Sequence, residues 1–407
     1  MLYNNINMKD DNQNLHIEQS SPSQQLLQND LTTQTIQPNV GAKNISYKFK
    51  RWMAWLIVGI ITFGFVLFNL LRFTLFKQKA VLPTYFWSAT DKFDSKNYST
   101  LSADENGEFC ILQLSDMHIL NGVSMLDNKT LDLANRLIEY SDPDLIVLTG
   151  DTVFTWDNER TLKKVITFFD DICKQRKIFW CLVFGNHDET GYVDETVLSE
   201  LLMQSKYCLF DAGPTNLNDD GKYGNSLGNY AVNITDNQGV DKCSLIFMDS
   251  NASGTDAEEG LYAPISRSTV SWYEWYINGM ANKNGGEVLP SLAFFHIPLL
   301  QSRLMMQDTP LGKNGYNEKV FSSDLDTGLF AKMLELKSTV ATFSGHDHQN
   351  YYQGYYNDYD VLLTNCVSCG YCTYGDTDLK GGRIIKINVN NQALALDTRV
   401  IFEAELD

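Results

Sequence analysis

The residues of this chain best suited to chemistry are histidines, aspartates and an asparagine that directly follow short apolar runs. The chain contains 6 His, and all but His16 lie in such places. The motifs are Ser115-Asp116-Met117-His118, Gly150-Asp151, Gly185-Asn186-His187-Asp188, Phe295-His296-Ile297-Pro298 and Gly345-His346-Asp347-His348. Carboxylates and neutral imidazoles are natural ligands for Zn, Mn or Fe, and an Asn carbonyl can complete a coordination shell. The residue types therefore predict a transition-metal site.

The spacing within these motifs favours one shared site. Side chains two residues apart on an extended segment point to the same side, so Asp116 and His118 can meet one ion, and so can His346 and His348. Glycines inside three of the motifs allow the backbone to turn sharply toward the site. A carboxylate such as Asp151 can bridge two cations ~3.5–4 Å apart. Each motif alone is weak, because a Gly-Asp pair is more often a plain turn, but their occurrence together and in order favours a site.

The apolar runs that carry the motifs alternate with amphipathic segments of helical length. Strands are predicted at 109–114, 145–149 and 178–184, with helices at 127–140 and 161–174 between them. This βαβαβ order predicts a parallel sheet with right-handed crossovers. Ligands bind beyond the carboxyl ends of such strands, where the motifs lie. Further strands are predicted at 244–248, 292–295 and 340–343, and antiparallel strands at 351–356, 360–364, 383–389 and 393–402.

A long apolar stretch, Trp52–Phe76, precedes this region and contains Arg72 as its only charge. At 1.5 Å rise per residue a helix of this length spans a bilayer core. A secretory signal peptide would have a shorter apolar region nearer the N-terminus. We therefore predict a single-pass transmembrane helix at 52–76, preceded by a disordered Asn/Gln-rich tail at 1–51. A linker at 77–105 and one folded domain at 106–407 complete the predicted organisation.

The charges around the span predict its orientation. Basic residues before it outnumber those at or after its end, which places the N-terminus in the cytosol and the large domain in a lumen or outside the cell. The residues counted are Lys43, Lys48, Lys50 and Arg51 against Arg72, Lys77 and Lys79. Glycosylation sequons agree with a lumenal domain and lie at Asn97, Asn128, Asn233 and Asn251. The formal net charge of −18 argues against a nucleic-acid partner, because phosphate contacts need clustered Lys and Arg.

Three of the 8 Cys, Cys366, Cys369 and Cys372, lie close together near the C-terminus. Three thiols without a nearby fourth ligand do not make a structural zinc site. In a lumenal domain, a disulfide among them or to another Cys is the prediction. Four others lie in apolar runs and are predicted to be core residues, namely Cys110, Cys173, Cys181 and Cys243.

The ordered set of motifs, from Asp116 to His348, resembles the calcineurin-like metallophosphoesterase superfamily. Connecting segments such as LQLSDMHI, PDLIVLTGD, FHIPL, SGHDHQNYYQG and Ile265–Tyr276 with its Trp272 are most similar to the branch of purple acid phosphatase 29-like proteins and the Dcr2 phosphatase. The resemblance implies an α/β fold, an αββα sandwich of two mixed sheets flanked by helices.

The resemblance also implies a dinuclear centre of divalent or trivalent transition-metal ions (Fe, Zn or Mn). One ion would be held by Asp116, His118, Asp151 and His348, and the second by Asp151, Asn186, His296 and His346. His187 would protonate the leaving group or stabilise the transition state, and Asp188 would orient the His187 imidazole.

One position departs from the purple acid phosphatases that this branch is named after. Those enzymes carry a Tyr three residues after the bridging Asp, and its phenolate on ferric iron gives the colour. Here the position is Phe154, which has no oxygen, and His118 takes up the ligand role. A purple colour is therefore not expected.

The expected activity is that of a membrane-anchored phosphoesterase, in which a metal-bridging hydroxide attacks a phosphate monoester. A phosphodiesterase of the sphingomyelinase-like or nucleotide type is the alternative, because the same ligands serve both reactions. A catalytically silent membrane receptor or adaptor on the same fold is the alternative from another class. A missing ligand would favour the silent protein, and none is missing. The substrate is expected to be selected by loops such as 249–264 and 301–323.

Overall fold

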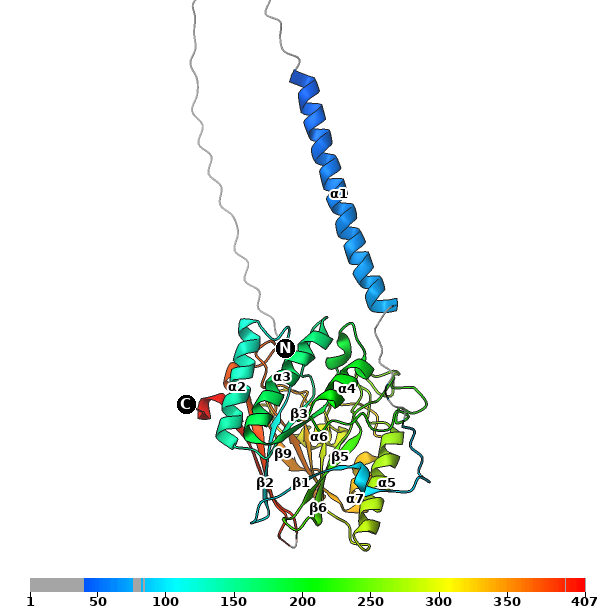
Figure 1. The fold of residues 1–407 in the computed structure, drawn as a ribbon, viewed down its shortest axis with the longest axis vertical. Helices are drawn as coiled ribbons and strands as arrows, with labels where there is room; N and C mark the ends of the chain where they lie inside the picture. The colour runs from blue at the N-terminus through cyan, green and yellow to red at the C-terminus, as the bar shows by residue number, and fades with distance from the viewer. Residues whose placement is uncertain (1–39, 76–81, 83–84, 392, 407) are drawn as a thin grey trace, which may run out of the picture. The chain divides into compact units, whose positions relative to one another are not determined.

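The computed structural model describes residues 40–75, 82, 85–391 and 393–406, and its ribbon is drawn in Figure 1. The chain divides into two units, Met1–Val66 and Leu67–Asp407, which are described separately below.

The N-terminal element is the long helix α1 (Val40–Leu75). Within it, Lys48–Phe68 is long and apolar enough to cross a membrane, with a mean hydropathy of 1.9 and none of it buried against protein. The helix begins at Val40, so residues 40–51 are helical, and the prediction of a disordered tail is wrong for them. The rest of the predicted tail, residues 1–39, lies outside the described residues.

Five strands form the first sheet, in the order β12-β11-β2-β3-β4. The strands β2, β3 and β4 are parallel and are connected by the helices α2 and α3, as predicted. A capping box starts α2, because the Ser124 hydroxyl accepts from the backbone N–H of Asp127 and the Asp127 carboxylate accepts from that of Ser124. The bounds are β2 Glu108–Leu114, α2 Met125–Ser141, β3 Leu145–Thr149, α3 Asn158–Arg176, β4 Phe179–Val183, β11 Gly381–Asn388 and β12 Ala395–Phe402.

Seven strands form the second sheet, in the order β1-β5-β6-β7-β8-β10-β9. Pairing in this sheet is mixed, since β6, β7 and β8 are parallel while β5 runs antiparallel to β6. The strand β10 was predicted to be antiparallel to its neighbours, but it is parallel to β8 and antiparallel only to β9. The bounds are β1 Ser99–Ser102, β5 Tyr230–Thr235, β6 Asp241–Phe247, β7 Ser291–Phe294, β8 Thr339–Ser344, β9 Gln353–Tyr355 and β10 Leu362–Asn365.

The central strands β5, β6 and β7 of the second sheet are buried on both faces, and alternate side chains serve two cores. On β6, Leu245 and Phe247 belong to the core shared with the first sheet, whereas Ile246 faces the helices on the other side. Aromatic rings cross four neighbouring strands on the face between the sheets, with centroid separations of 4.6, 5.2 and 5.2 Å for the pairs Tyr230–Phe247, Phe247–Phe294 and Phe294–Phe343. Burial of these rings holds the two sheets together.

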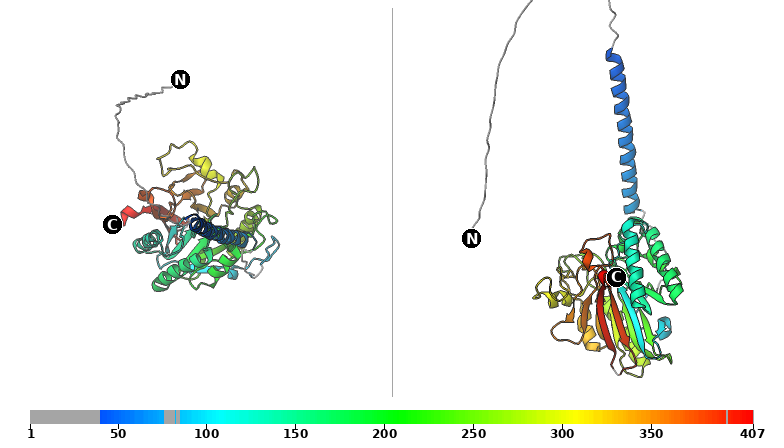
Figure 2. Two further views of the ribbon diagram at one scale, coloured as in Figure 1. Left: turned by 90° about the horizontal axis from the view of Figure 1, so that it is seen from above. Right: turned by 90° about the vertical axis from the view of Figure 1, so that its left-hand side faces the viewer.

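Helices cover the outer faces of both sheets, which completes the predicted αββα sandwich. The helices α2 and α3, with α4 (Glu195–Gln204) beside α3, cover the first sheet, and α5 (Arg267–Lys283) and α7 (Leu329–Leu336) cover the second. The short helix α6 (Leu300–Met306) lies in the connection after β7. The two views of Figure 2 show the helices of the first sheet (cyan and green) separated by the sheets from the segments drawn in yellow.

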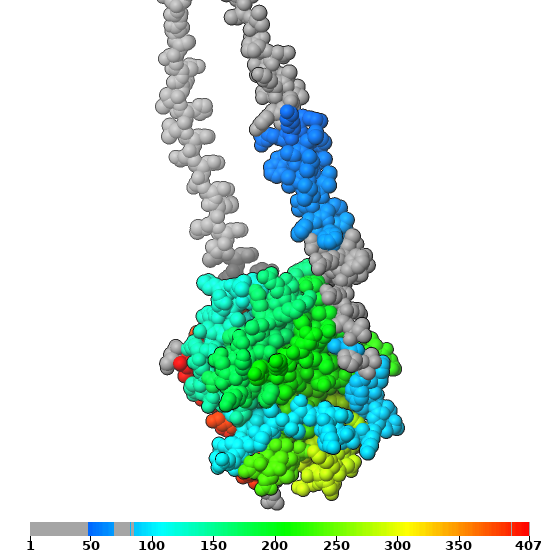
Figure 3. All heavy atoms as spheres, in the orientation of Figure 1, coloured from blue at the N-terminus to red at the C-terminus, as the bar shows by residue number. Residues whose placement is uncertain are grey.

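The segment predicted to be a linker contributes to the folded domain. Within residues 77–105, β1 pairs in parallel with β5, and the Trp87 ring packs edge-on against Trp275 with centroids 6.0 Å apart. Figure 3 shows the light-blue residues of this segment on the outer surface of the domain. The folded domain therefore includes residues that precede the predicted boundary at 106.

Candidate metal centre

The five motifs follow strands of both sheets. Asp116, Asp151 and Asn186 come shortly after β2, β3 and β4 of the first sheet, while His296 and His346 come after β7 and β8 of the second. Because these strands end at the same side of the sandwich, side chains far apart in the sequence lie within a few ångströms of one another.

The first group of metal-ligand candidates consists of Asp116, His118, Asp151 and His348. The Nε2 atoms of His118 and His348 are 3.2 Å apart. Asp116 Oδ1 lies 3.4 Å from Nε2 of His348, and Asp151 Oδ2 lies 3.4 Å from Nε2 of His118. All four side chains are buried, and one ligand atom from each lies within 4.8 Å of the others.

The second group consists of Asp151, His296 and His346, again buried and within 4.8 Å. Asp151 Oδ2 is 3.4 Å from Nε2 of His296, and Nδ1 of His346 is 3.3 Å from the same nitrogen. Asp151 belongs to both groups, which is the arrangement that a bridging carboxylate requires.

Unsatisfied buried oxygens test whether this set fits metal ions. Asp116 Oδ1 and Asn186 Oδ1 are buried and have no hydrogen-bond partner among the described residues. A buried oxygen left without a partner costs roughly 1–3 kcal/mol, whereas a cation would satisfy it. The residues therefore fit two metal ions, and the donor set of carboxylates, imidazoles and one amide suits transition metals.

The electrostatics of the centre favour positive charge. Burial alone would raise the pKa of Asp116, but His348 and His296 hold it well below its usual range. Burial would likewise lower the pKa of His296, yet the carboxylates of Asp151 and Asp116 raise it to about 10. Burial lowers the pKa of His118 to about 4. Burial would also raise the pKa of Asp151, but His296 and His118 hold it well below its usual range. Both carboxylates are therefore ionised at neutral pH, and His118 presents a neutral ring nitrogen.

Neighbouring carbonyls orient two of the imidazoles. The His296 Nδ1 lies 2.8 Å from the carbonyl oxygen of Thr149, and the His348 Nδ1 lies 3.2 Å from that of Tyr374. When Nδ1 donates to a carbonyl, Nε2 keeps its lone pair and is free to bind a metal ion. The Nε2 atoms are indeed the ones that point to the carboxylates.

The backbone at the centre is strained. Asp116, His118, Asp151 and His346 have φ of 52°, 47°, 51° and 73°, respectively, which is uncommon for residues with a Cβ and occurs preferentially at functional sites. Among the motif glycines, Gly150 has a positive φ of +86°, but Gly185 and Gly345 do not. These two glycines instead allow neighbouring segments to come close to the backbone. A Cβ on Gly345 would lie 1.8 Å from the Ser115 hydroxyl oxygen.

His187 lies at the edge of the centre, with its side chain 37% exposed and its Nε2 4.0 Å from Asp151 Oδ2. Its backbone N–H donates to Asp151 Oδ1 at 2.8 Å. The predicted contact with Asp188 is absent, because the Asp188 carboxylate accepts from the backbone N–H groups of Val153 and Gly185, each at 2.8 Å. Asp188 therefore ties together the loops after β3 and β4, and the prediction that it orients the imidazole is wrong.

A cavity of about 700 Å³ opens onto the metal centre. It is lined by ligand candidates, by His187 and by aromatic residues that include Phe154, Tyr262 and Tyr374. Apart from Phe154, these aromatic residues carry no local sequence pattern that marks them, because loops bring them to the centre.

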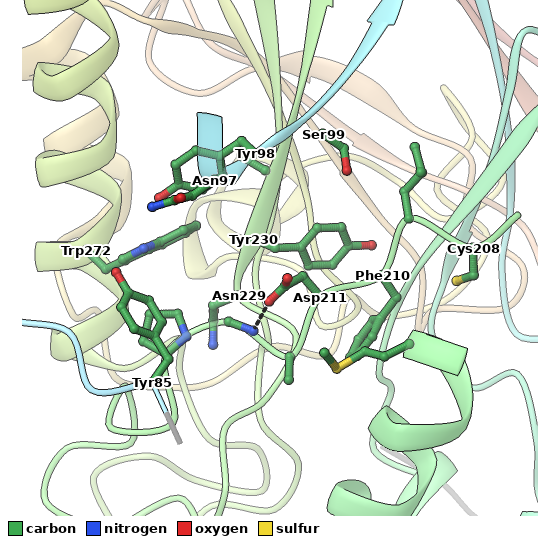
Figure 4. Close-up of a pocket in the computed structure, with 16 residues that line it drawn as sticks. Tyr85, Asn97, Tyr98, Ser99, Cys208, Phe210, Asp211, Asn229, Tyr230 and Trp272 are labelled. Carbon is green, nitrogen blue, oxygen red and sulfur yellow. Dashed lines mark hydrogen bonds between the residues drawn. The ribbon is translucent and has the colours of Figure 1, made fainter. Parts of the chain in front are cut away.

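A second cavity, of about 400 Å³, is drawn in Figure 4 and shares no residue with the first. Aromatic rings line much of it, among them Tyr85, Tyr230 and Trp272, and Asp211 is the only charged side chain among the described residues of its lining. No group of metal-ligand candidates found among the described residues lies there, so the chemistry is assigned to the first cavity.

All eight cysteines lie within the described ranges, and each is free. The predicted disulfide is therefore absent. Cys366 and Cys369 are buried instead, and Cys372 donates its S–H to Asp127 Oδ1 at 3.3 Å. The prediction of core positions holds for Cys173, Cys181 and Cys243, whereas Cys110 is only partly buried.

A model of the calcineurin-like phosphoesterase family matches residues 110–350, and the chain belongs to this family, as the motifs predicted. Among curated proteins, the probable inactive purple acid phosphatase 29 of Arabidopsis thaliana is 27% identical over 353 residues, which cover 80% of this chain and 87% of that protein. The phosphatase DCR2 of Saccharomyces cerevisiae is 30% identical over 295 residues, which cover 66% of this chain and 49% of that protein. The predicted branch of the family is thereby confirmed.

Among solved structures, a dimetal phosphatase from Danio rerio has a TM-score of 0.44 at 12% sequence identity. The match covers 72% of this chain and 96% of that one.

Proposed function

We propose that this chain is a membrane-anchored phosphoesterase that hydrolyses phosphate monoesters with two transition-metal ions. The observation that carries the proposal is the sharing of Asp151 between two buried groups of candidate ligands. A cluster of like-charged carboxylates this deeply buried is costly unless cations compensate it.

The predicted ligands are assigned to two ions in this proposal. The first ion is held by Asp116, His118, Asp151 and His348, and the second by Asp151, Asn186, His296 and His346. Bound there, the ions would neutralise charge on the phosphoryl group and lower the pKa of a water molecule.

His187 is assigned the transfer of a proton to the leaving group. Its Nε2 faces Asp151 at 4.0 Å, and more than a third of its side chain is exposed, so an ester in the cavity can reach the ring. The ring of Phe154 packs against it with centroids 4.6 Å apart, which restricts its orientation. An imidazole is the side chain that most often transfers protons in catalysis, which fits the acid role.

The names of the relatives point both ways on activity. The plant protein is named a probable inactive purple acid phosphatase, and the yeast protein is named a phosphatase. Every carboxylate and imidazole that the motifs predicted as a ligand is present in the two groups of this chain. The Phe at position 154 removes a tyrosine ligand but no residue of this set, so we assign an active centre.

Membrane anchoring rests on α1, and the orientation rests on flanking charges and sequons. We propose that the domain lies on the non-cytosolic side. Asn97 and Asn128 are exposed and accessible to glycosylation, while Asn233 is fully buried and its Oδ1 accepts from the Ser244 hydroxyl at 2.7 Å. The free cysteines count against an oxidising compartment, which makes a direct test of topology necessary.

The activity is tested on the full chain purified in detergent. Elemental analysis should find about two transition-metal ions per chain, and para-nitrophenyl phosphate should be hydrolysed faster than its bis ester. Chelation should abolish hydrolysis, and Mn or Zn should restore it. Asp151→Ala should lose both ions, whereas His16→Ala, outside the motifs, should lose neither. Full activity of the metal-free protein would overturn the proposal.

Topology is tested separately in membranes. The proposed orientation predicts that an endoglycosidase increases gel mobility and that Asn97→Gln with Asn128→Gln removes this shift. Unchanged mobility, combined with cleavage beyond residue 85 by a protease added to the cytosolic side, would reverse the orientation.

A further inference from the structure

Four aromatic rings surround the opening of the metal centre, and each comes from a different loop. They belong to Phe154, Tyr262, Phe321 and Tyr374, which all line the cavity of about 700 Å³. Three of them are large exposed groups, with 42% of Phe154, 36% of Phe321 and 52% of Tyr374 accessible to solvent. Apolar surface gathered around a cavity is typical of a ligand-binding site.

Three of these rings contact imidazoles, and together they reach both groups of candidate ligands. Tyr374 stacks on His348 with centroids 4.0 Å apart, and Phe154 lies edge-on to His118 at 5.7 Å. At the other group, the Tyr262 ring lies edge-on to His346 with centroids 4.5 Å apart. The Phe321 ring packs edge-on against Tyr262 with centroids 6.5 Å apart. A substrate whose phosphoryl group reaches the centre would therefore place its organic group among these rings.

In the part of the chain that the structure describes, the cavity lining holds no cationic side chain beyond its histidines. Among the described residues that line it, none is a lysine or an arginine. Lys319 is nearby, with Nζ 5.8 Å from the Phe321 ring centroid, but it is not part of the lining. The lining instead includes Glu318, whose Oε1 accepts from the backbone N–H of Gln349 at 2.7 Å. A second anionic group on a substrate would meet this carboxylate without a compensating cation.

We propose that the substrate is a phosphate ester of an apolar or aromatic alcohol that carries no further anionic group. The inference rests on the proposed function and narrows it. Multiply phosphorylated or carboxylated esters are disfavoured, because the cavity provides aromatic surface and negative charge rather than lysine or arginine.

Three esters of primary alcohols separate the organic group from leaving-group reactivity. Ethyl phosphate is the simplest of them. The second, 2-phenylethyl phosphate, carries a phenyl ring in addition, and the third, phosphoglycolate, carries a carboxylate. We expect kcat/KM for 2-phenylethyl phosphate to exceed that for ethyl phosphate by at least about tenfold, since burying a ring contributes at least this much to binding. Phosphoglycolate should be the poorest of the three.

Two variants and a control test the residues named. Phe321→Ala should reduce the ratio of kcat/KM between the phenylethyl and ethyl esters, mainly through KM, because its ring contacts no ligand candidate. Glu318→Gln should improve phosphoglycolate relative to ethyl phosphate. Tyr355→Ala removes a tyrosine that is 57% exposed but does not line the cavity, and should change neither ratio.

A binding measurement without turnover distinguishes this inference from the proposed function. Calorimetric titration with 3-phenylpropylphosphonate and propylphosphonate should give a Kd at least about tenfold lower for the aromatic compound. If the metal-loaded protein hydrolyses none of the esters, the proposed function fails, and the titration still tests the cavity. Equal dissociation constants, or a preference for phosphoglycolate, would overturn the inference whether or not the protein is active.

Discussion

The Nε2 atoms of His118 and His348 lie 3.2 Å apart, although the two histidines follow strands of different sheets. His118 comes after β2 of the first sheet, and His348 comes after β8 of the second. Two imidazoles can meet this closely only if they share a proton or a cation, and Asp116 and Asp151 supply the compensating negative charge. The centre therefore depends on the relative position of the two sheets.

Arg383 is a buried residue that fixes this position. It lies on β11 of the first sheet, and its Nη2 donates to the carbonyls of Tyr351, Tyr352 and Asn365 at 3.2, 3.5 and 2.9 Å. Its Nη1 donates to Gln353 of β9 at 3.0 Å. A lysine ammonium is a compact group with three donors, so it cannot hydrogen-bond all of these separated acceptors at once. We expect Arg383→Lys to lower the free energy of unfolding, measured by urea denaturation, by roughly 3 kcal/mol, because each lost hydrogen bond to a charged donor contributes ~1.5–3 kcal/mol.

The matched control for this prediction lies on the neighbouring strand. Arg399 on β12 pairs with Glu405, and its side chain is 54% exposed, so Arg399→Lys should change stability by less than ~1 kcal/mol. Equal effects of the two substitutions would show that the buried guanidinium does not join the sheets.

Gly185→Ala should damage the metal centre while sparing the fold. A Cβ at this position would lie 2.3 Å from both the backbone nitrogen and Oδ1 of Asp151, closer than any real contact. Either Asp151 or the loop after β4 must then move. We expect the variant to keep its circular dichroism spectrum but to bind less than one metal ion per chain. Gly59→Ala is the control, because its Cβ meets nothing within 4 Å, and the idea fails if both variants retain two ions.

The metal-ligand candidates could be predicted because their signal is local. A polar residue directly after an apolar run marks a strand end, and the chain repeats this at Asp116, Asp151 and His296. The parallel order of β2, β3 and β4 followed from the helical segments between them. Local sequence also supported the apolar helix, although its start at Val40 rather than Trp52 could not be predicted, since Val40–Arg51 is polar and marks no boundary.

The features that were missed depend on tertiary contacts. The strand β1 reads STLS, which carries no period-two pattern, and it is a strand because it pairs with β5. The direction of β10 depends on its pairing with β8. The partner of Asp188 could not be found from adjacency, because the backbone N–H of Val153 arrives from the preceding loop.

Asp249 should make stability depend on pH. Burial raises its pKa from 3.8 to about 7, and the charge of Glu189 adds to this rise. The folded state therefore holds this proton more tightly than the unfolded state. The resulting stabilisation is complete below about pH 4 and is lost as the pH rises toward 7.

In the wild type, the backbone N–H of Asn251 donates to Asp249 Oδ1 at 2.8 Å. Asp249→Asn removes the titration and keeps an oxygen that can accept this hydrogen bond. The melting temperature of the variant minus that of the wild type should therefore be higher at pH 8 than at pH 5. The underlying change in the free energy of unfolding is ~1.4 kcal/mol per unit of pKa shift. Asp211→Asn changes an exposed carboxyl and serves as control. A difference that does not vary with pH would contradict the assignment.

Adjacent residues of one motif should separate metal binding from proton transfer. Asn186 Oδ1 is buried without a hydrogen-bond partner among the described residues, whereas the His187 imidazole is partly exposed at the cavity. Asn186→Ala should therefore weaken binding of one ion, and high metal concentration should restore part of the activity. His187→Ala should keep both ions and lose ~10²–10⁴-fold in rate, which is the usual contribution of general acid catalysis.

The identity of the leaving group tests the role of His187 further. An alkoxide needs protonation as it departs, whereas nitrophenolate needs little, so the rate loss of His187→Ala should be large for ethyl phosphate and small for para-nitrophenyl phosphate. Elemental analysis of the same preparation excludes loss of an ion as the cause. If His187→Ala instead loses an ion, or slows both esters equally, then His187 contributes to the metal centre or to binding, and the proton donor is another group.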